Sequence, residues 1–211
     1  MTSFEVEKSL LSEDRRLIAG VDEAGRGSLF GPVVAAAVIL PAVWIPRPVR
    51  GWLAQVTDSK LLSPAKRRAL AGRILPEAVA LGLGFATNRE IDDKNIYWAS
   101  LEAMRRAVEN LAVRPHFVLT DGFKNWTDGF ACPQRGVTGG DRKCLTIAAA
   151  SIIAKVVRDE MMDVLDGFFN GYHLAKNKGY GTAEHYRALR AKGPTPLHRL
   201  SFNLGTPAGN A

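Results

Sequence analysis

Residues 17–27, LIAGVDEAGRG, form an apolar run that ends in two acidic residues and passes directly into a glycine-rich turn. A short apolar run bounded by turn residues is typical of a buried strand. The uncharged run over residues 33–40 follows the turn and is the expected hairpin partner of this strand. These residues place two paired strands at the start of the fold.

Further along the chain, strand signals alternate with helix signals. Ser63 provides an N-cap and Pro64 a first-turn proline for a helix. Glu102 and Arg106 are spaced for an i,i+4 ion pair on another helix. The expected elements are a helix over about 65–80, a strand over 81–87, a helix around 104–111, a strand over 116–121, a long apolar helix over 145–169 and a basic helix over 183–191. This order predicts an α/β domain with a mixed central β-sheet flanked by helices.

The length of 211 residues indicates one domain. We expect a core over about residues 17–170, a small helical C-terminal region over about 171–205 and a loose tail over 206–211. Lys and Arg outnumber Asp and Glu by 28 to 21, a net charge of +7. That excess suits a nucleic acid, although a mildly basic balance also serves solubility alone.

The cysteines and the N-terminus bear on the compartment. Cys132 and Cys144 lack zinc-site spacing and a disulfide framework, which agrees with a reducing cytoplasm. Residues 1–16 mix both charges, unlike a signal peptide. Residues 27–46 are uncharged over the length of a membrane span, but glycine and prolines interrupt them, so a buried strand is the better interpretation. We therefore expect a cytoplasmic protein without membrane contact.

Acidic residues end two of the expected strands. Asp22 and Glu23 end the first, Asp121 ends the strand over 116–121, and Asp141 precedes the long apolar helix. Sites in open α/β sheets gather at the carboxyl ends of strands. Carboxylates brought together there repel one another unless cations neutralise them, and hard oxygen ligands favour Mg²⁺ or Mn²⁺. Two such ions would suit phosphodiester hydrolysis.

Two observations keep this interpretation open. Adjacent strand residues point to opposite faces, so Asp22 and Glu23 reach one site only if the strand ends or bulges there. An acidic pair at a strand end is also most often a solvated turn. Phosphate-loop and dinucleotide motifs are both excluded, because residues 20–27 lack the Lys-Ser/Thr pair and the GxGxxG spacing.

The stretch IAGVDEAGRG, residues 18–27, resembles the signature of the ribonuclease HII family. The further motifs that agree are Asp58-Ser59-Lys60, Thr120-Asp121-Gly122, Gly140-Asp141 before IAAASIIAK (147–155), KGYGT (178–182), and His198-Arg199 with Ser201-Phe202. The resemblance runs over residues 17–202. Only sixteen residues precede it, whereas the sister type, ribonuclease HIII, usually carries a long N-terminal domain.

The resemblance implies a ribonuclease H-like fold and an endonuclease that hydrolyses RNA paired with DNA, leaving 5′-phosphate and 3′-hydroxyl ends. It implies catalysis and metal binding by Asp22, Glu23, Asp121 and Asp141, with two Mn²⁺ or Mg²⁺ ions. Gly25, Arg26 and Gly27 are expected to contact the 2′-hydroxyl at an RNA–DNA junction, the group that distinguishes RNA from DNA.

Tyr180 is expected to stack on the neighbouring deoxynucleotide sugar, which favours single ribonucleotides embedded in duplex DNA; without the resemblance, a core or turn tyrosine would be the better interpretation. The weaker candidates are Lys60 and Lys155 for phosphate contact, and Arg187, Arg190, Lys192, His198 and Arg199 for the duplex backbone in the C-terminal region. Asp159 lies too far along the helix from Asp141 to share one metal pair, so we expect it to be structural. Ser28, Leu61, Gly139 and Asn177 depart from residues common in the family.

Two other functions compete with the metal-dependent nuclease. One is a nuclease that uses histidine acid–base chemistry, for which His116, His173, His185 and His198 are the scattered candidates. The other is a basic module that binds hybrid duplexes without cleaving them, which the acidic set disfavours because bare carboxylates repel phosphate. No feature demands a protein partner, and we expect a monomer.

Overall fold

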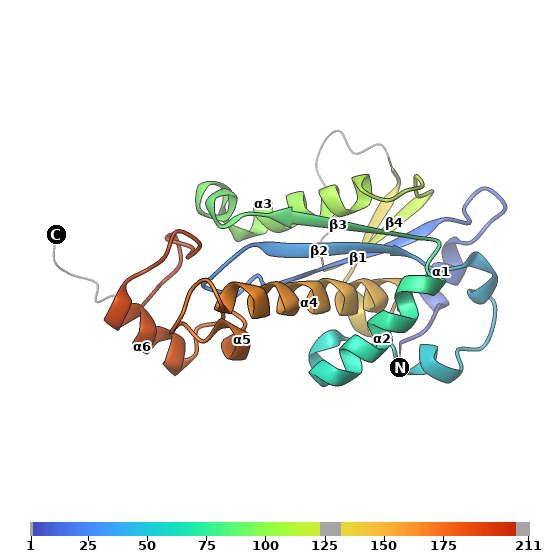
Figure 1. Cartoon of the computed structure of the whole chain (residues 1–211). Coiled ribbons are helices and arrows are strands. Elements are labelled where there is room, and N and C mark those ends of the chain that lie inside the picture. The colour runs from blue at the N-terminus through green and yellow to red at the C-terminus, as the bar shows by residue number, and fades with distance from the viewer. Residues whose placement is uncertain (1, 123–131, 206–211) are drawn as a thin grey trace.

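A computed structural model describes residues 2–122 and 132–205 and places them around one five-stranded sheet (Figure 1). The strands are β1 (Ile18–Ala24), β2 (Val33–Ile39), β3 (Ala80–Ala86), β4 (Phe117–Asp121) and β5 (Gln134–Val137). Their order in space is β3-β2-β1-β4-β5. The pairs β1–β2 and β2–β3 are antiparallel, whereas β1–β4 and β4–β5 are parallel. The mixed sheet expected from the sequence is therefore confirmed, and the carboxyl ends of β1 and β4 lie side by side.

Helices cover both faces of the sheet. The helices are α1 (Glu5–Leu10), α2 (Pro64–Glu77), α3 (Asn88–Glu109), α4 (Leu145–Asp166), α5 (Leu174–Asn177) and α6 (Ala183–Lys192). In Figure 1, α3 lies against one face, while α4 runs along the other with α2 beside it. Short 3₁₀ turns occur at Ala42–Trp44, Gly51–Gln55, Ser59–Leu61 and Gly140–Arg142.

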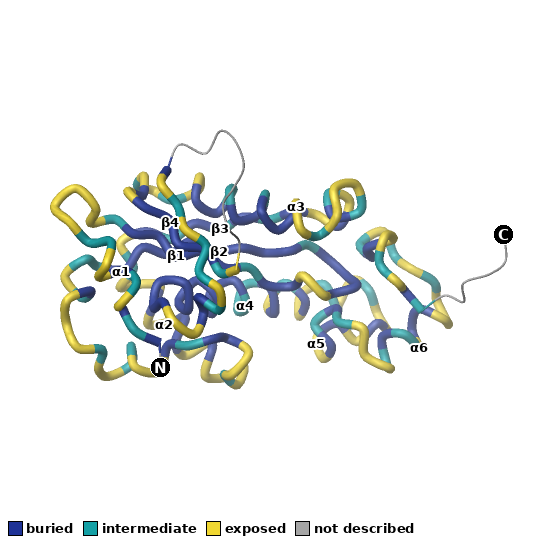
Figure 2. Tube along the Cα trace, turned by 180° about the vertical axis from the view of Figure 1, so that it is seen from behind, coloured by how far each residue is buried: buried dark blue, intermediate teal, exposed yellow. Residues whose placement is uncertain are grey.

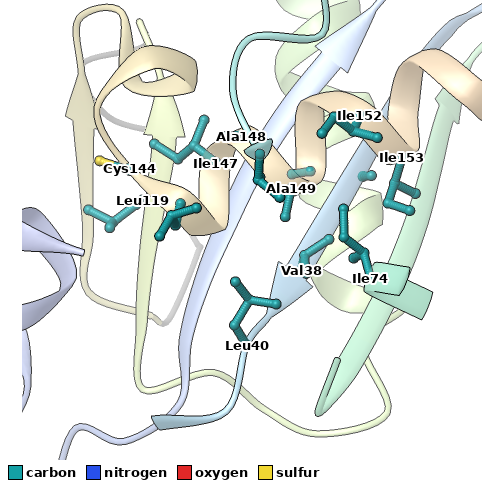
Figure 3. Close-up of a cluster of buried hydrophobic side chains, with 14 of the residues drawn as sticks. Val38, Leu40, Ile74, Leu119, Cys144, Ile147, Ala148, Ala149, Ile152 and Ile153 are labelled. Atoms are coloured by element: carbon teal, nitrogen blue, oxygen red, sulfur yellow. The ribbon is translucent and has the colours of Figure 1, made fainter. Parts of the chain in front are cut away.

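The core between α4 and the sheet is closely packed because small residues let the two backbones approach (Figure 3). Ala148, Ala149 and Ala150 are fully buried on α4. On the strand side, a Cβ atom at Gly20 would lie 2.1 Å from the carbonyl carbon of Thr146. Glycine at position 20 therefore fixes how close α4 lies to β1, and with it the acidic residues that follow on that strand.

The N-terminus of α4 is capped by a side chain distant in the sequence. Cys144 occupies the N-cap position and makes no side-chain capping hydrogen bond. Instead, the buried carboxylate of Glu7 on α1 accepts from the amide of Thr146 at 2.9 Å and from its hydroxyl at 2.8 Å. Burial raises the pKa of Glu7, whereas these hydrogen bonds lower it in part. The chain start thus holds the first turn of α4 in place.

The C-terminal region packs against the outer end of α4 (Figure 1). A separate apolar cluster joins Phe30 and Met162 to Tyr172, Leu174 and Leu189. Exposed stretches alternate with buried ones along α5 and α6, as expected for a thin layer on the main core (Figure 2). The expected basic helix is present, with Thr182 as its N-cap and Gly193 as its C-cap.

The expected strands and the other expected helices agree with the structure to within a few residues. The helix expected around 104–111 is the exception, because α3 already begins at Asn88, where Thr87 caps it. Three elements were not predicted: α1, α5 and the edge strand β5. The helix expected to reach residue 80 ends at Glu77, because β3 begins at Ala80. The expected pair between Glu102 and Arg106 is present at 3.1 Å. The uncharged stretch over 27–46 contains the buried strand β2, and no described helix has the length and apolar character needed to cross a membrane. The tail over 206–211 lies outside the described residues.

Candidate metal centre

Three of the four acidic residues expected to bind metal converge. Asp22 lies on β1, Asp121 ends β4, and Asp141 lies in the 3₁₀ turn Gly140–Arg142 before α4. One carboxylate oxygen from each lies within 4.8 Å of the others, and Asp22 and Asp141 are each 5% exposed. The parallel pairing of Val21 with Thr120 causes the first two to meet, because it aligns the residues that follow on both strands.

Backbone and hydroxyl groups orient these carboxylates. The Gly140 amide donates to Asp121 Oδ1 at 2.7 Å, which ties the turn that carries Asp141 to the end of β4. The Glu23 amide donates to Asp22 Oδ1 at 2.7 Å, and the Ser151 side chain on α4 also hydrogen-bonds Asp22. The site is therefore assembled from two strands, one turn and one helix.

Glu23 lies beside this group and is not one of the three that meet. The strand does not end at Asp22, because β1 continues to Ala24 and Glu23 pairs with Ala35 of β2. The Glu23 carboxylate lies 3.6 Å from the Arg26 guanidinium. Burial raises the pKa of Glu23, and the charge of Asp121 raises it further, whereas Arg26 and a hydrogen bond with Asp22 lower it in part. Glu23 therefore shares the electrostatic environment of the three aspartates.

The electrostatics show a site short of positive charge. Burial, followed by the charges of Glu23 and Asp121, raises the pKa of Asp22 well above its usual value. Burial and the charge of Asp121 also raise the pKa of Asp141. An all-oxygen donor set of crowded carboxylates suits a hard divalent cation, and the residues present therefore fit Mg²⁺ or Mn²⁺.

Lys60 is the expected phosphate contact nearest to these acids. The buried carboxylate of Asp58 accepts from the Lys60 amide at 2.9 Å and from Arg142 Nε at 3.0 Å, which fixes the backbone under the exposed Lys60 side chain. Burial lowers the pKa of Lys60, but the charges of Asp22, Asp58 and Asp141 raise it more. Lys60 is thus held as a cation at the edge of the acidic group.

The residues expected to recognise the junction also come together. Gly25 adopts a positive φ of 95°, and Arg26 and Gly27 are exposed. Ser28, directly after this turn, forms an isolated β-bridge with Tyr180. The Tyr180 ring is partly exposed, so the glycine-rich turn and the tyrosine share one surface.

The structure corrects one expectation and limits another. His198 and Arg199 cannot line a duplex backbone, because they are 1% and 0% exposed. Arg199 donates to the carbonyl oxygens of Gly31 and Arg26 instead, at 2.9 and 2.8 Å. Lys155 is partly buried and paired with Asp159 at 2.7 Å. Asp159 also pairs with Arg67 at 3.3 Å, as suits a structural residue. Arg187, Arg190 and Lys192 are exposed.

Sequence reasoning assigned no role to two residues that matter here, Ser151 and Arg158. With Lys155, they occupy positions i, i+4 and i+7 of α4, an otherwise apolar helix at this point. Polar residues at that spacing share one helix face, which is a signal the sequence contains. The departures Ser28 and Asn177 are buried, and Asn177 Oδ1 accepts from the Gly179 amide at 2.8 Å.

Comparisons with known proteins bear on the family and the fold of this chain. A family model described as "Ribonuclease HII" matches residues 19–204. A ribonuclease HII of Solibacter usitatus is 51% identical over 197 residues, which cover 93% of this chain and 82% of the relative. The crystal structure of ribonuclease H2 from Pyrococcus horikoshii OT3 superposes with a TM-score of 0.72 at 24% identity, covering 89% of this chain and 94% of that one.

A second solved structure concerns the metal. Bst-RNase HIII, whose structure was determined in complex with Mn²⁺, superposes with a TM-score of 0.64 at 20% identity, covering 91% of this chain and 69% of that one. Both structures therefore share the fold found here.

Proposed function

The chain belongs to the ribonuclease HII family and is a metal-dependent endoribonuclease, and we propose that it hydrolyses the RNA strand of RNA/DNA hybrids and cuts at ribonucleotides embedded in duplex DNA. The observation that carries this proposal is the convergence of Asp22, Asp121 and Asp141 within 4.8 Å. No histidine belongs to that group. His185 and His198 are buried, His116 lies just before β4 at the end of that strand opposite Asp121, and His173 precedes α5 in the C-terminal region, which argues against histidine acid–base chemistry at this site.

Asp22, Asp121 and Asp141 would hold divalent ions, Mn²⁺ or Mg²⁺, with Glu23 at the side of the site. Bound there, two ions would lower the pKa of the attacking water and stabilise the leaving oxygen. The carboxylates supply the negative charge that would retain the ions. The Gly140 amide orients the carboxylate of Asp121, and the Ser151 hydroxyl orients that of Asp22. Lys60 would contact a substrate phosphate near the scissile bond, and the products would carry 5′-phosphate and 3′-hydroxyl ends.

Recognition of the ribonucleotide is assigned to the turn Gly25, Arg26 and Gly27 together with Tyr180. A Cβ atom at Gly27 would meet nothing within 4 Å, so the backbone there is open to a close approach by substrate. The 2′-hydroxyl is the group that such a backbone contact would recognise. The exposed arginines of the C-terminal region, residues 171–205, would contact the duplex backbone. We also propose a cytoplasmic location, which is the location expected from the free cysteines.

The test is cleavage of a labelled DNA duplex that contains one ribonucleotide, with Mn²⁺, with Mg²⁺ and with EDTA. We expect cutting on the 5′ side of the ribonucleotide with metal and none with EDTA. Cleavage that persists in EDTA and leaves a cyclic phosphate would support the histidine mechanism instead. Tight binding without cleavage under any metal condition would support the binding module.

Asp121→Asn tests the site itself, because it keeps the shape of the side chain and removes its charge. Asp14→Asn is the matched control, since Asp14 is exposed and lies before β1, at the end of the strand opposite Asp22. We expect the first variant to lose cleavage by at least about a hundredfold and the second to keep it. A folded Asp121→Asn protein that cuts at the wild-type rate would contradict the proposed centre.

A further inference from the structure

Arg158 is a fully buried arginine on α4 that the mechanism above does not use. Its guanidinium donates to four acceptors from two separate segments of chain. Nη2 donates to Ser28 Oγ at 2.6 Å and to the Phe30 carbonyl at 3.1 Å, Nε donates to the Pro32 carbonyl at 3.3 Å, and Nη1 donates to the Lys178 carbonyl at 2.8 Å. None of these acceptors is a carboxylate. Burying a cation whose hydrogen-bond acceptors are all neutral costs folding free energy, which suggests that Arg158 is retained for a function other than stability.

The two segments joined by Arg158 are also joined to each other through Ser28. The Ser28 hydroxyl lies 2.9 Å from the carbonyl oxygens of both Phe30 and Gly179. The Leu29 amide donates to the Gly179 carbonyl at 2.8 Å. Ser28 and Arg158 therefore form a polar joint between the turn that begins at Gly25 and the loop that carries Tyr180.

The turn is shaped to admit Arg158. A Cβ atom at Gly25 would lie 1.9 Å from Arg158 Nε, and its φ of 95° already disfavours other residues. Glycine at this position is thus required by the arginine behind the turn as well as by the turn itself. Any change that moves the guanidinium would move the turn with it.

The same helix sets the orientation of the tyrosine ring. Arg158 Cζ lies 5.5 Å and Lys155 Nζ lies 5.3 Å from the centroid of the Tyr180 ring. Both distances are within the range of a cation–π interaction. Arg158 therefore contacts the backbone of the junction-recognising turn and the ring of Tyr180 at once.

We propose that Arg158 is a positioning residue for ribonucleotide recognition, which acts with Ser28 to hold the 25–28 turn and Tyr180 in one fixed geometry. This inference rests on the proposed function, because it assumes that the turn and Tyr180 contact the two sides of an RNA–DNA junction. A recognition pair acts on a junction only when the spacing of its members is fixed before binding, and small displacements are costly.

The test compares kcat/KM on two substrates, a DNA duplex with one ribonucleotide and a uniform RNA/DNA hybrid. Ser28→Ala removes one hydroxyl and leaves every backbone acceptor in place, so it is expected to fold. We expect its kcat/KM to fall by about tenfold or more on the single ribonucleotide, and by much less on the hybrid, which has no deoxynucleotide beside each ribonucleotide. Arg158→Lys, which keeps the charge but offers fewer donors, is expected to change the same ratio in the same direction.

Ile74→Ala is the control for a loss of stability alone. Ile74 is fully buried on α2 and belongs to the apolar cluster between α4 and the sheet, whereas Phe30 at the joint belongs to a different cluster. We expect this variant to melt at a lower temperature and to retain the wild-type ratio between the two substrates. If Ser28→Ala and Arg158→Lys also retain that ratio, the two residues are merely structural and the inference is wrong.

Hydrogen exchange gives a readout that does not depend on activity. The Leu29 amide donates across the joint to the Gly179 carbonyl, and we expect it to exchange at least about tenfold faster in Ser28→Ala. Unchanged exchange would show that the hydroxyl does not hold the two segments together, and would overturn the inference. Wild-type protein that cuts neither substrate would instead contradict the proposed function, while the exchange measurement would still decide whether the joint exists.

Discussion

The hydroxyl of Ser151 hydrogen-bonds the Asp22 carboxylate and lies 2.9 Å from the hydroxyl of Ser59. Ser59 belongs to the same turn as Lys60, so one small side chain connects the acidic group to the lysine beside it. Groups that orient a metal ligand affect metal binding without touching the ion, because a carboxylate free to rotate must be ordered on binding. Ser151 is therefore expected to affect metal binding by orienting Asp22, without being a metal ligand itself.

We predict that Ser151→Ala weakens Mn²⁺ binding by about 10- to 100-fold, as measured by titration calorimetry on the folded protein. Ser100→Ala is the matched control, because Ser100 is also buried, on α3, and its hydroxyl has no hydrogen-bond partner among the residues that the structure describes. The control is expected to bind Mn²⁺ with the wild-type affinity. Equal affinity for both variants would show that Asp22 needs no orientation from α4.

At the scale of elements, a chain of histidines ties the C-terminal segment to the loop that carries Tyr180. The Thr195 amide donates to His198 Nδ1 at 2.9 Å, so that nitrogen is an acceptor. His198 Nε2 lies 3.1 Å from His185 Nε2, and His185 Nδ1 lies 3.0 Å from the Tyr180 carbonyl. All three contacts are satisfied when both rings are neutral and each carries its proton on the side facing Tyr180.

The stability of this connection is predicted to depend on pH. Burial, with a smaller contribution from His185, lowers the pKa of His198 from 6.5 to about 4. Between these values the unfolded chain binds more protons than the folded one, so the free energy of unfolding rises with pH. The stabilisation is complete above about pH 6.5 and is lost as the pH falls towards 4, by at most about 3 kcal/mol.

Urea unfolding of the wild type and of His198→Gln between pH 4 and 8 measures this difference. The pH dependence of the variant should be the shallower of the two, since acidic residues that titrate in the same range contribute to both proteins. His173→Gln serves as the control, because the contact of His173 with Glu184 at 3.9 Å is open to solvent, and this variant should stay closer to the wild-type curve than His198→Gln. Parallel curves for the wild type and His198→Gln would contradict the prediction.

The elements that sequence reasoning found are those with local signals. The hairpin of β1 and β2 follows from an apolar run, two acids and a glycine-rich turn, all within one stretch of chain. The strand β5, QRGV, was missed because it is short and polar and is paired on one side only, with β4. Such an edge strand forms because of its tertiary contacts, and the local sequence does not predict it.

The side chains that sequence reasoning misplaced are buried charges. Arg199 was expected on the surface because arginines are rarely buried. Its Nε and Nη1 atoms are instead held by two backbone carbonyls that lie more than 160 residues away in the sequence. The capping role of Glu7 was not predicted for a related reason. Helix caps are normally residues next to the helix in sequence, whereas Glu7 lies 139 residues from Thr146. Nothing near either residue in the sequence reveals its partner.

At the scale of the whole molecule, the acidic centre lies within a chain of net charge +7. The exposed cations must therefore attract the duplex to a site whose own charge repels phosphate. We expect the C-terminal helix α6 to contribute to this attraction at one end of the molecule, where Arg187 and Arg190 line a shallow groove together with Tyr186 and Asn203. The other face of α6, which carries His185 and Leu189, is buried, so its basic residues lie on the exposed face.

We predict that the double variant Arg187→Gln, Arg190→Gln weakens binding to a DNA duplex with one ribonucleotide and to an all-DNA duplex by similar factors. Phosphate contacts release counterions, so the slope of log Kobs against log salt should become shallower by about one for each contact removed. Fluorescence anisotropy in EDTA, which prevents cleavage, measures both. Arg73→Gln removes an exposed cation on α2, a helix that lies apart from α6 in Figure 1, and should leave the slope unchanged. If the double variant retains the wild-type slope, α6 does not contact the duplex, and the attraction must come from cations closer to the acidic centre, of which Lys60 is the first to test.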